Sequence, residues 1–394
     1  MRKENINRAS RVEQFDLDGI LKNLERNMGV AYTLDGKGYR LGLSVKLLAA
    51  QIQFMNLVIQ SDKVPYEIKS DIHGKAGVGK SKLADYAGLL PAFGRLLFDS
   101  LVLPPDLNLF HRIFSKHGIR KLSHKEDDPI DQIFAATFND FVLNLRTEGK
   151  RIDIKRQMQG WQRNAVENAK RLASYLDALY RRYGRLKVVR LDLLYRQAAC
   201  QDFEEAKQWD QVLKALHARE RGPSPEESIR NDLEHDLPRV DIITATQDWR
   251  HLKDNMRGKP SLFGEMVGYV CSIEFSSTGG HYLHVMLAFE GSWITPHEWL
   301  SDLIGQYWVE ITGGRGYFRN YSQGFHKHAT TGLINHDDTE KRRRLLRELM
   351  LLAKKDQFVR VAVPPKSKTF MTGRFPMPSF SESERRRAED WASS

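Results

Sequence analysis

The sequence has few cysteines and no long apolar run, and both absences narrow the classes of protein that it can encode. Its 394 residues include two cysteines, Cys200 and Cys271, in unrelated surroundings. They give neither a disulfide framework nor the paired spacing of a zinc site, so we expect a protein of the reducing cytoplasm. No apolar stretch approaches the roughly 18 residues of a membrane span, and the first residues lack the apolar segment of a signal peptide. We therefore expect no membrane partner.

Acidic residues are fewer than basic ones, and the imbalance points to a polyanionic partner. There are 61 lysines and arginines against 50 aspartates and glutamates, which gives a formal net charge of +11. The hydrophobic content of 41% and the charged content of 28% are ordinary for a globular protein. An excess of positive charge favours nucleic acid as the partner.

Apolar periodicity divides the chain into a helical N-terminal half and a mixed C-terminal half. Up to residue 182 apolar residues recur mostly at steps of three and four, most clearly over residues 161–182. Beyond it, short β-branched segments at 185–195, 265–275, 281–289 and 357–363 predict strands, and 204–222, 295–311 and 339–355 predict helices. We expect an α+β fold with a helical domain (1–182), a sheet domain (183–375) and a polar tail (376–394). The helical half could also mediate homo-oligomer formation.

The stretch "GKAGVGKS", residues 74–81, matches the pattern of a phosphate-binding loop through Gly74, Gly79, Lys80 and Ser81. In such a loop backbone amides surround the phosphates, the lysine reaches the terminal phosphate and the serine holds magnesium. A buried parallel strand must precede the loop, but "KVPYEIKSDI" is polar and contains a proline. We therefore interpret residues 74–81 as a flexible loop and do not expect ATP to bind, with a P-loop NTPase kept as an alternative.

Three polar residues fall on one side of the predicted strands. Side chains alternate between the faces of a strand, so Asp192, Glu274 and His284 would meet on one face if the strands pair in one sheet. His281 falls by the same alternation on the opposite face. Carboxylates with an imidazole suit a divalent ion such as magnesium or manganese. The alternative is that each is a solvated residue on a half-exposed antiparallel sheet.

Several segments resemble one protein family in the same order along the chain. They are "RLKVVRLDLLYR", "GEMVGYVCSIEFSSTGGHYLHVMLAFEG", "LIGQYWVEITGGRGYF", "TGLIN", "LLAKKDQFVRV" and "KTFMTGR", and together they cover about residues 183–375. They resemble the YagK/YfjJ-type C-terminal domain, the replication-protein family of filamentous phages (inoviruses) and related prophages. That family is similar to the HUH endonucleases, which initiate rolling-circle replication. The resemblance implies an HUH/RRM-like antiparallel sheet with flanking helices.

The resemblance also implies a reaction and the residues for it. A His–hydrophobic–His pair and an acidic residue on the next strand would bind a divalent metal, and a tyrosine of a late helix would attack single-stranded DNA. Glu274 matches the acidic ligand and His284 the second histidine, whereas Tyr282 stands where the first histidine belongs, next to His281. The position of the tyrosine holds Leu351, followed three residues later by the expected lysine, Lys354.

These replacements leave three hypotheses for the function of the chain. It could be an active nicking initiator, a relative that binds DNA as a regulator or accessory replication factor, or a P-loop NTPase whose C-terminal half binds DNA. Binding to single-stranded or hairpin DNA is predicted separately by basic residues in "EKRRRLLRE" and "GGRGYFRNYSQGFHKH". The candidate contacts are Arg315, Arg319, Lys327, Arg343, Arg344, Arg347 and Lys354.

Overall fold

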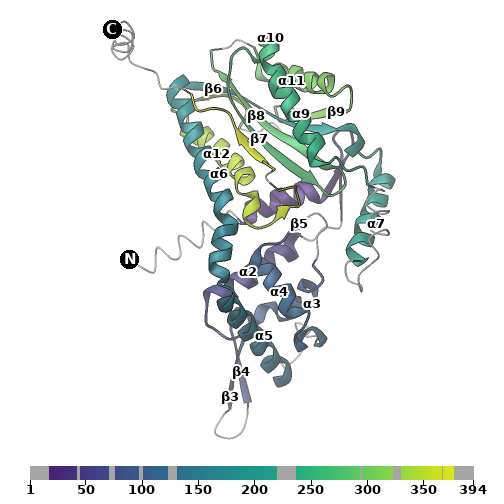
Figure 1. Ribbon diagram of the computed structural model, residues 1–394, viewed down its shortest axis with the longest axis vertical. Helices are drawn as coiled ribbons and strands as arrows, with labels where there is room; N and C mark the ends of the chain where they lie inside the picture. The colour runs from purple at the N-terminus through teal and green to yellow at the C-terminus, as the bar shows by residue number, and fades with distance from the viewer. Residues whose placement is uncertain are drawn as a thin grey trace.

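Helices and antiparallel strands make up the protein, so the predicted α+β class is confirmed. Figure 1 shows the computed structural model. It describes residues 17–41, 45–70, 76–96, 101–122, 131–219, 237–292, 295–322, 330–365 and 367–376. Within these ranges no helix is both long enough and apolar enough to cross a membrane.

A six-stranded antiparallel sheet lies at the centre of the C-terminal half. Its order is β10-β6-β8-β7-β12, and β9 pairs with β6 beside β10. The three longest strands confirm the predictions for residues 185–195, 265–275 and 281–289, and β7 and β8 form the expected hairpin. The strands are β6 (Arg185–Tyr195), β7 (Met266–Ser276), β8 (Gly280–Glu290), β9 (Gly316–Asn320), β10 (Gly332–Asn335) and β12 (Phe370–Thr372).

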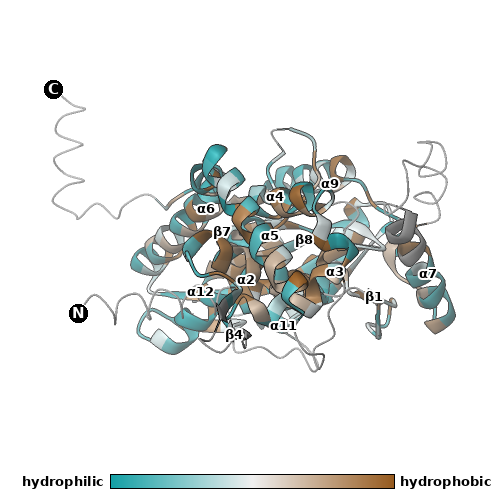
Figure 2. Ribbon diagram, turned by 90° about the horizontal axis from the view of Figure 1, so that it is seen from below, coloured by the Kyte–Doolittle hydropathy of each residue, from teal (hydrophilic) through white to brown (hydrophobic). Residues whose placement is uncertain are grey.

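Helices cover both faces of the sheet. On one face, α9 (Ile242–Asn255), α10 (Pro260–Phe263) and α11 (His297–Ile311) bury Trp249 and Trp308 against strand residues such as Leu191 and Val285. On the other, α6 (Ile154–Tyr183) and α12 (Thr339–Ala353) pack on Val188 and Met286. The strands are apolar on both sides in this part of the sheet, so the expectation of a half-exposed sheet is wrong. In Figure 2 the apolar colour accordingly lies towards the inside of the molecule.

The helical half has a core of its own, built largely from aromatic rings. Helix 17–28, α2 (Val45–Gln60), α3 (Leu90–Phe93), α4 (Pro105–Phe114) and α5 (Gln132–Arg151) contribute to it. Phe54 lies at its centre, with the rings of Phe93, Phe110 and Phe138 all about 6 Å away. Helix α6 begins in this core at Ile154 and then runs along the sheet, so it belongs to both halves (Figure 1).

The predicted strand at 357–363 is shorter than expected and pairs outside the main sheet. Only Arg360 and Val361 form β11, and they pair with β5 (Leu101–Val102) of the helical half. A 3₁₀ turn at Lys355–Gln357 precedes the strand, and the prolines at 364–365 follow it. Val359 is buried in the core of the helical half.

Of the predicted flexible loop, the described residues 76–81 lie in a strand or directly after it. This strand, β4 (Ala76–Lys80), forms an antiparallel hairpin with β3 (Tyr66–Ser70), which projects from the helical half in Figure 1. Tyr66 fixes its base, because the Asn139 side chain of α5 accepts from its backbone nitrogen (2.9 Å) and donates to its carbonyl oxygen (2.7 Å). This contact between residues far apart in the sequence stabilises a hairpin in spite of the proline and glycines, which favour a loop.

A small satellite cluster completes the fold beside the sheet. The predicted helix at 204–222 is α7 (Phe203–Arg219), and its Trp209 packs with Ala31 and Leu41 around the short pair β1 (Val30–Tyr32) and β2 (Gly38–Arg40). The other 3₁₀ turns among the described residues are Ala84–Leu89, Gly118–Lys121, Arg196–Ala198 and Met256–Gly258.

Candidate functional site

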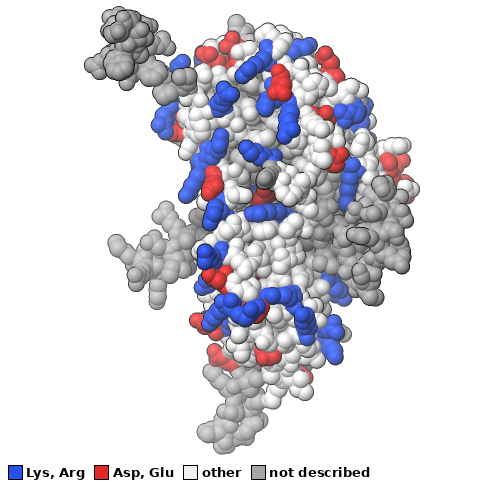
Figure 3. Space-filling model, viewed as in Figure 1, with Lys and Arg blue, Asp and Glu red and all other residues white. Residues whose placement is uncertain are grey.

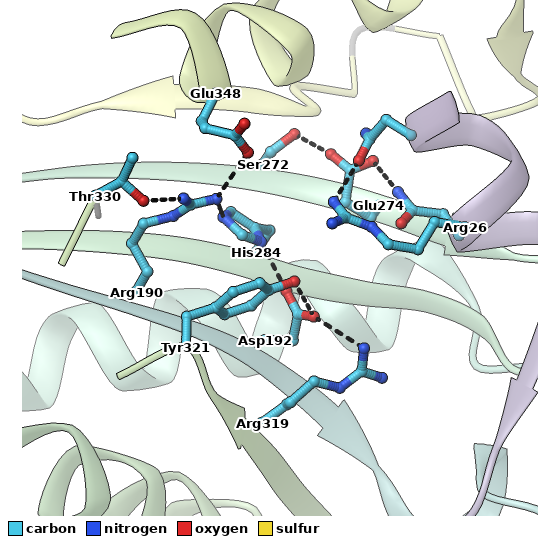
Figure 4. A network of polar contacts seen from close by, with 12 residues as sticks. Arg26, Arg190, Asp192, Ser272, Glu274, His284, Arg319, Tyr321, Thr330 and Glu348 are labelled. Carbon is cyan, nitrogen blue, oxygen red and sulfur yellow. Dashed lines mark hydrogen bonds and ion pairs between the residues drawn. The ribbon is translucent and has the colours of Figure 1, made fainter. Parts of the chain in front are cut away.

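A row of polar side chains crosses the sheet on the face that carries α6 and α12. Strand register places Arg319, Asp192, His284 and Ser272 next to one another on β9, β6, β8 and β7. The Nδ1 atom of His284 lies 2.7 Å from Oδ1 of Asp192. The predicted meeting of Asp192 and His284 on one face is therefore confirmed (Figure 4).

Both ring nitrogens of His284 are engaged within the protein. Nε2 lies 3.3 Å from Nη2 of Arg190. Arginine can only donate, so Nε2 accepts and the ring proton on Nδ1 is directed at Asp192. Arg190 is 2% exposed, and burial lowers the pKa of its guanidinium. It also donates to Oγ1 of Thr330 (2.7 Å).

Asp192 receives further support through its second carboxylate oxygen. Tyr321 donates to this oxygen at 2.9 Å, and Nη1 of Arg319 lies 3.8 Å from it. Burial alone would raise the pKa of Asp192, but the hydrogen bond from His284 and the charge of Arg319 lower it to about 2. The Arg319 guanidinium also stacks over the ring of Tyr32, 4.0 Å from its centroid. Asp192 is thus an ionised, fully paired carboxylate.

Glu274 is the centre of a second group of polar side chains, on the same face of the sheet and two residues after Ser272 on β7. Ser272 donates to its Oε1 atom at 2.5 Å, and Asn27 donates to Oε2 at 3.1 Å. The ammonium of Lys355 lies 3.0 Å from Oε1 and also donates to the backbone carbonyl of Ile273. The lysine that reaches the predicted acidic ligand is therefore Lys355, which follows α12, and not Lys354.

Helix 17–28 closes over this end of the sheet. Its Asn27 contacts Glu274, and Arg26 points from the helix towards the same region (Figure 4). At the start of the helix, a methyl group on Gly19 would lie only 2.9 Å from Cδ2 of Leu351. Asp192, His284 and Glu274 are consequently only 3–5% exposed. None of them is the solvated residue that the alternative prediction described.

The structure separates His281 from this group. His281 faces Phe275, with ring centroids 5.1 Å apart, and its Nδ1 lies 3.1 Å from the carbonyl oxygen of Val240 on the opposite side of the sheet. The strand pairing is regular here, because Glu274 pairs with Tyr282 and Phe275 with His281. Tyr282 is the residue that shares the polar face, and burial together with Asp192 and Glu274 raises its pKa.

Neither α12 nor the tyrosine bonded to Asp192 offers the nucleophile that the resemblance implies. The sequence of α12 contains no tyrosine, and Leu351 packs against helix 17–28. Tyr321 is the tyrosine hydrogen-bonded to Asp192, but it is buried, and burial and Asp192 raise its pKa, which keeps its hydroxyl protonated. A protonated, buried hydroxyl is poorly suited to attack phosphate.

A divalent ion does not fit these side chains as they are arranged. His284 has no nitrogen left for a metal, and the carboxylates of Asp192 and Glu274 already contact Arg319 and Lys355. Among the residues that the structure describes, no three histidine, cysteine or acidic side chains gather in a way that could hold a metal.

Sequence reasoning missed most of the cations around these acids. Strand alternation does place Arg190 on the same face of β6 as Asp192. Arg26 comes from a helix and Lys355 from a turn, and the sequence around them does not indicate contact with the sheet. The same holds for Tyr321.

The predicted nucleic-acid contacts fall into separate places. Arg343, Arg344, Arg347 and Lys354 line one groove beside α12. Arg319 belongs to the buried network. Arg315 binds Asp248 of α9 (3.1 Å), in the layer on the other side of the sheet. Lys327 lies outside the described residues.

The phosphate-loop candidates also take other positions. Gly79 and Lys80 lie in β4, paired with Glu67 and Tyr66 of β3, and the backbone nitrogen of Ser81 donates to Pro65 (3.0 Å). Gly74 lies outside the described residues. An antiparallel strand engages the backbone amides that a phosphate loop would direct at its ligand, so residues 76–81 lack the geometry of such a loop.

No family model, curated protein or solved structure matches the chain. The geometry of the described residues therefore carries the functional assignment.

Proposed function

We propose that the chain is a DNA-binding protein of the HUH-like, rolling-circle initiator kind that does not nick DNA. It would act as a regulator or an accessory replication factor. The antiparallel sheet with flanking helices agrees with the fold that the resemblance implies. Glu274 lies on the strand next to that of His284, which is the relation expected for the two ligands.

The absence of nicking rests on one observation: side-chain cations accompany the acids that a metal would need. A divalent ion placed beside them would meet strong repulsion from these cations in a poorly hydrated setting. The resemblance, in addition, implies a tyrosine nucleophile at the position that Leu351 occupies. The charge pairs are Arg319 with Asp192 (3.8 Å) and Lys355 with Glu274 (3.0 Å).

Retention of DNA binding is supported by the distribution of charge. The protein has a net charge of +11, and not all of its cations lie in the buried network, because α12 carries exposed arginines. On the face in Figure 3, the blue of lysine and arginine predominates over the red of the acids. A basic surface of this kind binds phosphates with an affinity that falls steeply as salt increases.

The test is incubation with labelled single-stranded and hairpin oligonucleotides in manganese, and again in EDTA. We expect salt-sensitive binding in both, and no labelled protein band on a denaturing gel. A covalent adduct would show that a nucleophile survives and would refute the proposal that nicking is lost. If neither oligonucleotide binds at low salt, the proposal fails as a whole.

A further inference from the structure

The carboxylate of Glu274 is bound by residues from two elements outside the sheet. Asn27 of helix 17–28 donates to its Oε2 atom (3.1 Å). The ammonium of Lys355, in the turn after α12, lies 3.0 Å from its Oε1 atom. Figure 4 shows this carboxylate beside the helix that carries Arg26. Each oxygen of Glu274 therefore holds one residue that approaches the sheet from elsewhere in the chain.

Asn27 connects this carboxylate to the core of the helical half. Leu17 and Leu21, on the same helix, are 3% and 5% exposed and belong to that core, and Leu24 packs against it. Asn27 lies about 9 Å further along the helix than Leu21. One end of helix 17–28 is thus buried in the helical half while the other is bonded to the sheet.

Lys355 makes a second connection of the same kind. The chain runs from Lys355 through a 3₁₀ turn to Val359, which is 4% exposed in the helical core, and to β11, which pairs with β5. Arg360 stacks on the ring of Trp161 of α6, 3.9 Å from its centroid. Trp161 in turn donates to the carbonyl oxygen of Gln357 (3.1 Å). These contacts hold the turn in place, so the position of Lys355 and the pairing of β11 with β5 depend on each other.

Both connections depend on the negative charge of one carboxylate. The side chains of Glu274 and Lys355 are 6% and 15% exposed. If the carboxylate were neutral, the ammonium would be buried without its partner, which is costly. The ammonium would gain by moving towards solvent, and this movement would displace the turn that leads to Val359. The hydrogen bond from Asn27 would weaken as well, because it would no longer be made to a charged acceptor.

We propose that Glu274 is a latch between the two halves of the molecule. Its carboxylate holds the helical half on the sheet through Asn27 and Lys355, and its neutralisation loosens both connections at once. Helix α6 also joins the two halves, but it does so along its own length and without a contact to Glu274. The latch therefore sets how firmly the halves are held together and does not separate them. This conformational device is independent of the proposed DNA-binding function.

The first experiment measures amide hydrogen exchange in Glu274→Gln by mass spectrometry. We expect exchange to rise by about tenfold or more in helix 17–28, β5 and β11, because loss of one partner of a buried ion pair is strongly destabilising. Exchange in β6 and β8, at the centre of the sheet, should stay close to that of the wild type. Unchanged exchange in helix 17–28, or a rise of equal size in β6 and β8, would overturn the proposal.

The matched control is Asp248→Asn. Asp248 is also a buried carboxylate, 8% exposed, and it binds a cation and a hydroxyl group, those of Arg315 (3.1 Å) and Tyr195 (3.0 Å). Both partners belong to the C-terminal half, so this variant should leave exchange in helix 17–28, β5 and β11 unchanged. If Asp248→Asn loosens these segments as much as Glu274→Gln does, the effect is not specific to Glu274 and the proposal fails.

A third variant, Asn27→Ala, tests one connection by itself and decides the matter if Glu274→Gln does not fold. It leaves the pair of Glu274 and Lys355 intact. Exchange should therefore rise in helix 17–28 and stay unchanged in β5 and β11. No rise in helix 17–28 would show that Glu274 does not hold this helix, and an equal rise in β5 and β11 would show that the two connections are not separate. Either result would refute the latch.

Discussion

A single lysine neutralises Glu274 in a setting that excludes most water. Their side chains are 15% and 6% exposed, and Lys355 also bonds Ser272 and the backbone of Ile273. The attraction within a buried pair roughly offsets the cost of removing both charges from water. The loss of one partner is more costly, because it leaves the other charge buried and uncompensated.

Replacement of Lys355 by methionine should therefore destabilise the protein strongly. We expect the free energy of unfolding in urea to fall by about 3–5 kcal/mol, and Glu274→Gln in the same chain to restore most of it. Lys37→Met is the control, since its pair with Asp35 is exposed, and it should leave stability nearly unchanged. Unaltered stability in Lys355→Met would show that the pair does not balance Glu274.

Strand alternation predicts half of this network and fails for the other half. It correctly brings Asp192 and His284 together, because residues of one parity on paired strands must share a face. It cannot supply Arg26 or Lys355, which arrive from other elements. Because these cations come from other elements, the carboxylate–imidazole pattern suggested a metal site when only the sequence was considered. In the structure, the acids are paired with side-chain cations instead.

Helix 17–28 and α12 contact each other where Gly19 faces the end of the Leu351 side chain. A wheel drawn for α12 alone places Leu351 opposite the apolar stripe, among cations, and so suggests an exposed position. The structure places Leu351 against Gly19, and the sequence pattern of α12 does not predict this contact. The β3–β4 hairpin was missed for a similar reason, since Asn139 of α5 anchors it.

A bulky residue at position 19 should separate these two helices. Gly19→Ile adds atoms where even a methyl group would meet Leu351, so we expect a loss of about 1–3 kcal/mol in the free energy of unfolding. Leu351→Ala should relieve part of that loss when combined with it. Gly160→Ile in α6 is the matched control, because nothing lies within 4 Å of an added Cβ there. An equal effect of both isoleucines would rule out close packing of the two helices.

At the scale of the whole molecule, α6 joins the two cores. Its 30 residues span roughly 45 Å. Ile154 lies in the helical core, whereas Leu172 and Leu176 cover the sheet. A boundary near residue 183, as apolar periodicity suggested, would separate the sheet from the helix that buries one of its faces.

A fragment of residues 183–376 should therefore not fold by itself. Without α6 it would expose strand residues such as Val188 and Met286, and it would also lack helix 17–28. We expect it to bind the dye ANS and to give no near-ultraviolet circular dichroism, unlike residues 17–376. A cooperative unfolding transition of the fragment would instead support an independent domain that begins at 183.

The pairing of β11 with β5 has a consequence for synthesis on the ribosome. The helical half emerges first, but its core receives Val359, and its β5 receives a partner, only after residue 361 has been made. Domains usually fold in the order of their translation. In this chain the part that is translated first waits for residues 359–361, and the sheet waits for β12 (Phe370–Thr372), so both halves should reach their native state only after residue 372 has been made.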